Sequence, residues 1–238
     1  MKKGQDIKVL IILVALLFII NYPFLDRTLT KFLTKTETIL VNRVIDGDTI
    51  EAENRNESIR LLGVNTPERG EFYYKEAKQF LESRILNETV TLRFGRDRHD
   101  KYDRTLAYIF LNNKNINLEL VEKGFANYYF PSGKDAYYND FVDAWNRCIQ
   151  KNVNLCEAST NSCASCIKLK DSKTLINSCN FFCNINGWKI KAEGRNYTAF
   201  SYALESQEEV SFELPLAQTG DTIFLRDDGG KLVFWKRY

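Results

Sequence analysis

Histidine is almost absent from this 238-residue sequence, in which His99 is the only one. It lies beside Asp100 in a charged stretch, where a single histidine is usually solvated, so a histidine general base is disfavoured. A basic excess is also missing, because 33 Lys and Arg face 31 Asp and Glu. Binding of nucleic acid mainly by counterion release requires such an excess, so any polyanionic substrate must be held by a few placed groups.

Charge is absent from Val9 to Leu25, a run of 17 residues that three lysines precede. This length is at the short end of the range that crosses the hydrocarbon core of a membrane. No small-residue cleavage pattern follows the run. We predict an uncleaved transmembrane anchor in residues 1–26, a polar spacer in 27–36, and the remaining chain outside the cell. The alternatives are a cleaved signal peptide, which would leave the protein secreted, and a buried core helix.

Cysteine is absent from the first 147 residues, and all six cysteines follow. In an exported chain, an even number of cysteines indicates a disulfide framework. Two pairs are nested around residue 173, so two strands that turn at 171–173 would bring them within disulfide reach. The predicted pairs are Cys163 with Cys183, Cys166 with Cys179, and Cys148 with Cys156. A four-cysteine zinc site, C-x2-C followed by C-x3-C, is the alternative for the first two pairs.

Residues 37–157 combine strand and helix patterns. Runs of β-branched residues with turn signals between them predict five strands, and helical spacing predicts three helices. The strands are expected at 38–45, 49–53, 58–64, 89–94 and 105–111, the helices at 72–86, 116–123 and 135–149, and a further aromatic strand at 125–130. This order predicts a small barrel capped by helices, a mainly β fold of the α+β class.

Residues 163–238 follow a polar linker and contain about seven short strand candidates without a competing helical period. Such a pattern predicts a compact β-sandwich as a second domain.

The pattern of carboxylates and arginines indicates phosphodiester chemistry. Asp46 and Asp48 flank Gly47, so an extended path would place both carboxylates on one face, where they repel unless a cation lies between them. Arg60 and Arg104 lie in or just before strand candidates. A hard cation held by oxygens and two guanidinium groups would stabilise a phosphate under attack. The alternatives that need no function are an Asx turn for the carboxylates and surface salt bridges for the arginines.

Three ordered motifs then resemble the staphylococcal nuclease (thermonuclease) family: VIDGDT at 44–49, RLLGVNTPE at 60–68 and DKYDRTLAYI at 100–109. The resemblance extends from about Ile39 to Gln150. It implies a five-stranded OB-type barrel that cleaves DNA and RNA with Ca2+.

The resemblance also implies a role for individual residues. Asp48 would be a metal ligand, and Thr66 would bind the metal through its backbone carbonyl. Arg60 and Arg104 would hold the phosphate, and Glu68 would lie beside the attacking water. The resemblance places a tyrosine, Tyr102, near the phosphate.

Two positions depart from the family. Asn65 stands where the family usually has Asp, so a third metal ligand becomes a neutral carbonyl, and calcium affinity should fall. Asp103 stands where the family usually has Gly, and Asp tolerates the left-handed backbone better than most residues. An added carboxylate there would weaken the hold of Arg104 on phosphate. Two further aromatic residues, Tyr128 and Tyr129, are candidates for contact with an exposed nucleotide.

Two stretches of the C-terminal region resemble a lamin-tail domain: INGWKIK at 185–191 and TGDTIFLRDDGGKLVFWKRY at 219–238. This resemblance implies an Ig-like β-sandwich, and it does not identify the partner that the sandwich would bind. We therefore predict a membrane-anchored, extracellular, Ca2+-dependent endonuclease acting on DNA or RNA. The alternatives are a non-catalytic OB-fold module that binds nucleic acid and an extracellular scaffold.

Overall fold

The computed structural model describes residues 36–192, 197–214 and 222–237. The chain divides into two units, Met1–Thr36 and Glu37–Tyr238. In the described residues no helix has the length and apolarity needed to cross a membrane. The anchor predicted in 1–26 and nearly all of the spacer lie outside these residues.

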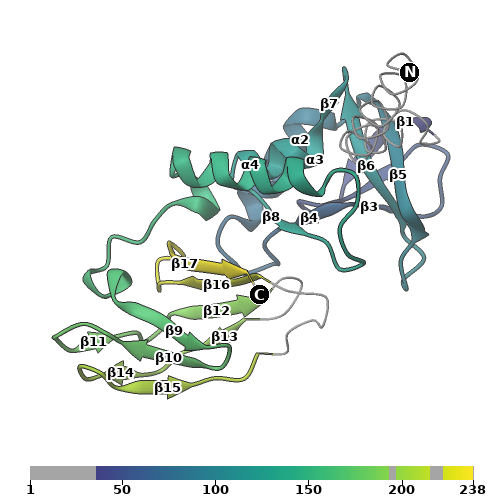
Figure 1. Cartoon of the computed structure of the whole chain (residues 1–238). Helices are drawn as coiled ribbons and strands as arrows, with labels where there is room; N and C mark the ends of the chain where they lie inside the picture. Colours follow the sequence, from purple (N-terminus) through teal and green to yellow (C-terminus); the bar gives the residue numbers. More distant parts are fainter. Residues whose placement is uncertain (1–35, 193–196, 215–221, 238) are drawn as a thin grey trace, which may run out of the picture. The chain divides into compact units, whose positions relative to one another are not determined.

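Five strands close into a barrel (Figure 1). Neighbouring strands follow the order β3-β2-β1-β5-β6, and parallel pairing of β3 with β6, with Ile59 opposite Thr105, closes the ring. In the described residues the fold is therefore mixed α+β with three α-helices and a closed five-stranded barrel, which fits an OB-type fold. The barrel strands are β1 (Thr36–Val44), β2 (Thr49–Ala52), β3 (Ile59–Leu61), β5 (Thr89–His99) and β6 (Thr105–Leu111), and β7 (Lys114–Asn115) adds a short edge.

Three helices pack beside the barrel: α2 (Tyr74–Ile85), α3 (Ile116–Glu122) and α4 (Tyr138–Lys151). Helix α2 buries Ala77, Leu81 and Ile85, which recur every fourth residue and so share one face. The Asn115 side chain accepts from the backbone N–H of Leu118 and caps α3. In a separate two-stranded sheet, β4 (Gly63–Asn65) pairs with β8 (Asn127–Tyr129), so the strand predicted at 58–64 is in fact two strands.

The C-terminal strands, β9 to β17, form three small sheets with the orders β15-β10-β9, β11-β14 and β13-β12-β16-β17. Trp188 is buried in their core. The Ig-like assignment stays a prediction. The strands are β9 (Ile167–Asp171), β10 (Thr174–Asn177), β11 (Cys183–Asn184), β12 (Lys189–Ala192), β13 (Thr198–Ala199), β14 (Ala203–Leu204), β15 (Glu209–Ser211), β16 (Thr222–Arg226) and β17 (Leu232–Arg237).

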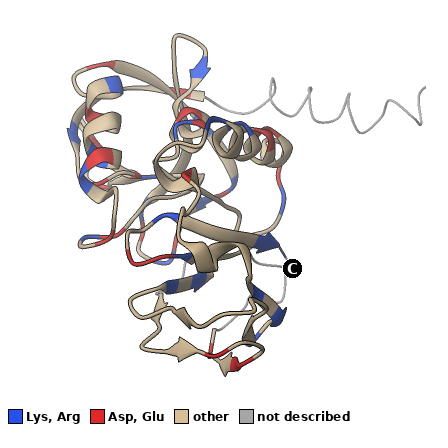
Figure 2. Cartoon of the chain, turned by 90° about the vertical axis from the view of Figure 1, so that its left-hand side faces the viewer, with Lys and Arg blue, Asp and Glu red and all other residues tan. Residues whose placement is uncertain are grey.

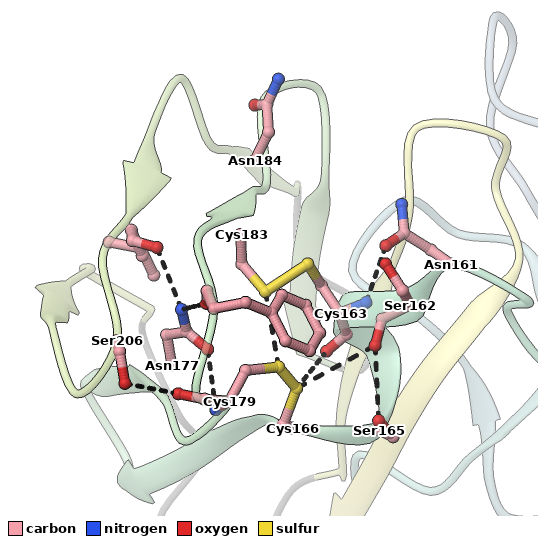
Figure 3. Close-up of a disulfide and its surroundings, with 12 residues drawn as sticks. Asn161, Ser162, Cys163, Ser165, Cys166, Asn177, Cys179, Cys183, Asn184 and Ser206 are labelled. Atoms are coloured by element: carbon pink, nitrogen blue, oxygen red, sulfur yellow. Dashed lines mark hydrogen bonds between the residues drawn. A yellow bond between two sulfur atoms is a disulfide. The ribbon is translucent and has the colours of Figure 1, made fainter.

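Disulfides join the cysteines in three pairs, and the part of the chain that the structure describes has no free cysteine. The pairs are Cys148–Cys156, Cys163–Cys183 and Cys166–Cys179. The last two lie side by side, with the sulfurs of Cys179 and Cys183 3.5 Å apart (Figure 3). Cys166 and Cys179 directly flank the β9–β10 hairpin, whereas Cys163 lies further out on the 3-10 helix Ser162–Ser165 and Cys183 on β11.

Candidate active site

The turn between β1 and β2 carries the two candidate metal-binding carboxylates. The backbone N–H of Ile45 donates to the carbonyl of Thr49 at 2.9 Å, and that of Asp48 donates to Asp46 Oδ1 at 3.0 Å. Gly47 faces Thr66, and a Cβ at this glycine would lie 2.9 Å from three side-chain atoms of Thr66. A larger residue would push the two segments apart, so glycine permits their close approach.

Asp48 connects three elements of the site through one buried carboxylate. Its Oδ2 accepts from the backbone N–H of Thr66 at 3.1 Å and from Thr66 Oγ1 at 2.9 Å. The same oxygen lies 3.0 Å from a guanidinium nitrogen of Arg60, and Oδ1 accepts from Thr49 Oγ1 at 3.1 Å. Asp48 is only 7 % exposed, and a buried carboxylate needs such partners. The structure therefore brings Asp48, Arg60 and Thr66 together.

Arg60 is fixed by its own backbone surroundings. Its guanidinium donates to the carbonyl of Leu61 at 2.8 Å and to that of Val64 at 3.0 Å, and its side chain is 13 % exposed. Arg60 lies opposite Leu106, two residues beyond Arg104. Arg60 therefore comes from β3 and Arg104 from just before β6, the strand with which β3 pairs.

Arg104 is held by Asp100. Its Nε donates to Asp100 Oδ2 at 2.7 Å, and its backbone N–H donates to Oδ1 at 3.0 Å. Partial burial raises the pKa of Asp100, but the hydrogen bonds from Arg104 outweigh burial and hold this pKa below its usual value. Asp103 adopts the left-handed backbone, with φ 64°. The carboxylate paired with Arg104 is thus Asp100, whereas the sequence pointed to Asp103.

Glu68 lies in the exposed segment that follows β4. Its backbone N–H donates to Glu71 Oε2 at 2.8 Å, and its carbonyl accepts from the backbone N–H of Glu71 at 2.9 Å. In the described parts of the chain its carboxylate has no hydrogen-bond partner. Its position therefore depends on the backbone of this segment.

The three tyrosines proposed to contact a nucleotide have different environments. Tyr102 is 68 % exposed, and its ring centroid lies 5.5 Å from the guanidinium carbon of Arg104, so it remains a candidate. Tyr129 is partly exposed and also remains one. The prediction that Tyr128 contacts a nucleotide is wrong, because this residue is 2 % exposed and its ring meets the rings of Tyr138 and Trp145 edge-on. Adjacent residues of β8 point to opposite faces, and Tyr128 is on the core face.

The donor atoms fit a hard divalent cation. The carboxylates of Asp46 and Asp48, the carbonyl of Thr66 and the amide of Asn65 offer only oxygen ligands, which Ca2+ prefers. Burial raises the pKa of Asp46, and the nearby charge of Asp48 raises it further. A bound cation would relieve this repulsion. Asn65 is 8 % exposed and supplies no charge.

Two residues that the sequence did not single out, Asp100 and Glu71, bind groups of the candidate site. Asp100 pairs with Arg104, and Glu71 binds the backbone of Glu68. Glu71 stands three residues after Glu68, which is the spacing at which a carboxylate can accept a hydrogen bond from a preceding backbone N–H. This spacing is the feature of the sequence that could have identified Glu71.

Known proteins resemble the chain over this region. The family described as "Staphylococcal nuclease homologue" matches residues 58–157. The thermonuclease of Staphylococcus intermedius is 35% identical over 160 residues, which are 63% of this chain and 95% of that protein. The thermonuclease of Staphylococcus hyicus is 31% identical over 159 residues, 60% of this chain and 91% of that protein. An uncharacterized endonuclease of Haemophilus influenzae is 32% identical over 104 residues, 42% of this chain and 57% of that protein. With nearly the whole length of the first thermonuclease matched at this identity, the chain belongs to the staphylococcal nuclease family.

Proposed function

We propose that this protein is a calcium-dependent nuclease that hydrolyses phosphodiester bonds of DNA or RNA outside the cell. The observation that carries the proposal is the shared Asp48 oxygen, which contacts both Thr66 and Arg60. It joins a candidate metal-binding segment to a candidate phosphate-binding group. The names of the thermonuclease relatives support a nucleic acid substrate.

Each residue has one role in this proposal. When bound, calcium neutralises the phosphate and makes phosphorus more susceptible to attack. Arg60 donates to a phosphate oxygen from a position that its carbonyl contacts already fix, so little reorganisation is needed. Arg104 supplies a second guanidinium, whose N–H groups would be divided between Asp100 and the phosphate. Glu68 orients the attacking water and accepts its proton.

Charge is interspersed over the ribbon (Figure 2), so the substrate would be held by these placed groups and not by a general positive field. Tyr102, exposed beside Arg104, is positioned to contact an adjacent nucleotide.

The test compares hydrolysis of DNA and of RNA by the full chain in saturating calcium and in chelator. The variant Glu68→Gln should lower kcat by about 10²- to 10⁴-fold, the usual contribution of a general base. Glu76→Gln makes the same change at an exposed position of α2 and should not affect the rate. Equal rates with and without calcium would contradict the proposal. Nucleic acid binding without hydrolysis in saturating calcium would instead identify the non-catalytic binding module.

The extracellular location is supported by the three disulfides, since thiols are kept reduced in most cytosols. Alkylation of native cells followed by mass mapping of the cysteines should find all six paired. Free thiols or bound zinc at Cys163, Cys166, Cys179 and Cys183 would contradict this part of the proposal.

A further inference from the structure

The segment Glu68–Tyr73 is contacted by β12 and by the turn between β16 and β17. Lys191 of β12 donates to both carboxylate oxygens of Glu71, at 2.9 and 3.0 Å. The ring of Phe72 packs on Gly230, where a Cβ would lie 2.4 Å from the ring. Lys231 lies 3.5 Å from the hydroxyl of Tyr73. The segment that bears Glu68 is therefore anchored from outside the barrel.

The Lys191–Glu71 pair is more than a surface ion pair. The two side chains are 17% and 19% exposed, and Lys191 contacts both oxygens of the carboxylate. Glu71 Oε2 also accepts a hydrogen bond from the backbone N–H of Glu68. One carboxylate thus links a lysine of β12 to the backbone of Glu68.

We propose that Lys191 is a positioning residue for the reaction, holding Glu71 so that Glu71 fixes the backbone of Glu68. This inference rests on the proposed function, in which Glu68 acts on the attacking water. The Glu68 carboxylate has no partner of its own in the described chain, so the backbone contacts set where it lies. The C-terminal strands then take part in catalysis without touching the substrate.

The test uses three lysine variants of the full chain. Lys191→Met should lower kcat roughly 10- to 100-fold with little change in KM, because a small displacement of a catalytic group costs rate and not substrate binding. Lys191→Arg should restore most of the rate, since a guanidinium can also donate to both carboxylate oxygens. Lys170→Met is the matched control. It removes a lysine that likewise contacts both oxygens of Glu209 at 2.7 and 2.9 Å, and it should leave kcat unchanged.

A second measurement does not depend on hydrolysis. Arg69 and Gly70 are exposed, so trypsin can cleave after Arg69, and loss of the anchor should accelerate this cleavage in Lys191→Met but not in Lys170→Met. Thermal unfolding of each variant shows whether it is folded. An unchanged kcat and an unchanged cleavage rate in folded Lys191→Met would overturn the inference. A wild-type chain without hydrolysis would refute the proposed function, and the cleavage rate would then decide alone whether Lys191 anchors the segment.

Discussion

Asp48→Asn tests the central group of the site, because it removes a charge and retains the shape. Asp48 Oδ2 accepts from Thr66 twice and pairs with Arg60, while Oδ1 accepts from the hydroxyl of Thr49. In the variant, the amide oxygen can take the place of Oδ2 and keep both hydrogen bonds from Thr66. The NH2 group then takes the place of Oδ1 and donates to the Thr49 hydroxyl, which rotates to accept this hydrogen bond. The main loss is therefore the counter-ion of Arg60.

The size of the loss follows from burial. Breaking a buried ion pair by removing one partner costs about 3–5 kcal/mol. Arg60 keeps its bonds to the carbonyls of Leu61 and Val64, and removal of the Asp48 charge relieves its repulsion of Asp46. Both effects offset part of the cost, so we expect a loss of about 2–3 kcal/mol in the free energy of unfolding. For a chain of this size that corresponds to a fall in Tm of about 4–12 °C.

Calcium gives the second half of the experiment. A ligand at 100 times its Kd raises the free energy of unfolding of the wild type by about 2.7 kcal/mol, provided that it binds only the folded state. Urea titrations of Asp48→Asn should give the same midpoint with calcium and with chelator. Asp97→Asn makes the same change at an exposed position of β5 and should respond to calcium like the wild type. A destabilised Asp48→Asn that retains the full calcium response would show that Asp48 is structural and not a metal ligand.

Three further predictions concern the frame around the site. Replacing Cys148 and Cys156 by Ala opens a loop with a sequence separation of 8, and urea unfolding should show a loss of about 2–3 kcal/mol. Trp145→Ala should cost about 3–5 kcal/mol in the same assay, because this fully buried ring contacts aromatic residues from β8, β16 and β17. A hydrogen bond from Lys151 lowers the pKa of Glu122 in the folded protein. The Glu122 carboxylate therefore stabilises the fold at a pH above its ordinary pKa of 4.5, and this stabilisation is lost as the pH falls through the lowered pKa of the folded protein. Wild type and Glu122→Gln should therefore differ in unfolding free energy near neutral pH and converge in acid.

Local patterns predicted most barrel strands and helices to within three residues, but β5 runs to His99, five residues beyond the strand predicted at 89–94. The prediction at 105–111 is the observed β6, because its apolar β-branched run has clear turn signals at both ends. The prediction at 58–64 missed the break between β3 and β4. Gly63 has φ 74°, and a Cβ there would lie 2.8 Å from Phe141 of α4. That contact spans 78 residues, so no local pattern could reveal it.

Part of the candidate site's geometry agrees with the sequence prediction. Asp48, Arg60 and Thr66 are in contact. Residue type had indicated a cation at the carboxylate and phosphate binding by the arginine, whereas only the family resemblance had pointed to Thr66. Tyr128 was misjudged because the residue type does not tell which face of β8 lies against α4. Lys191 was missed because it lies 120 residues from Glu71, and only the tertiary fold brings the two together.

The boundary at 157–163 separates two stretches of sequence but not two independent interiors. Phe224 and Leu232 belong to the barrel core, Trp235 packs against it, and the rings of Phe224 and Trp235 meet Trp145 edge-on. Tyr128 lies 3.4 Å from Thr222 through their hydroxyl oxygens. The C-terminal strands therefore complete the apolar interior beside α4, and through Lys191 they also reach the segment that bears Glu68. A module joined only by a flexible linker would have neither contact, so in this chain the C-terminal strands are part of the surroundings of the candidate site.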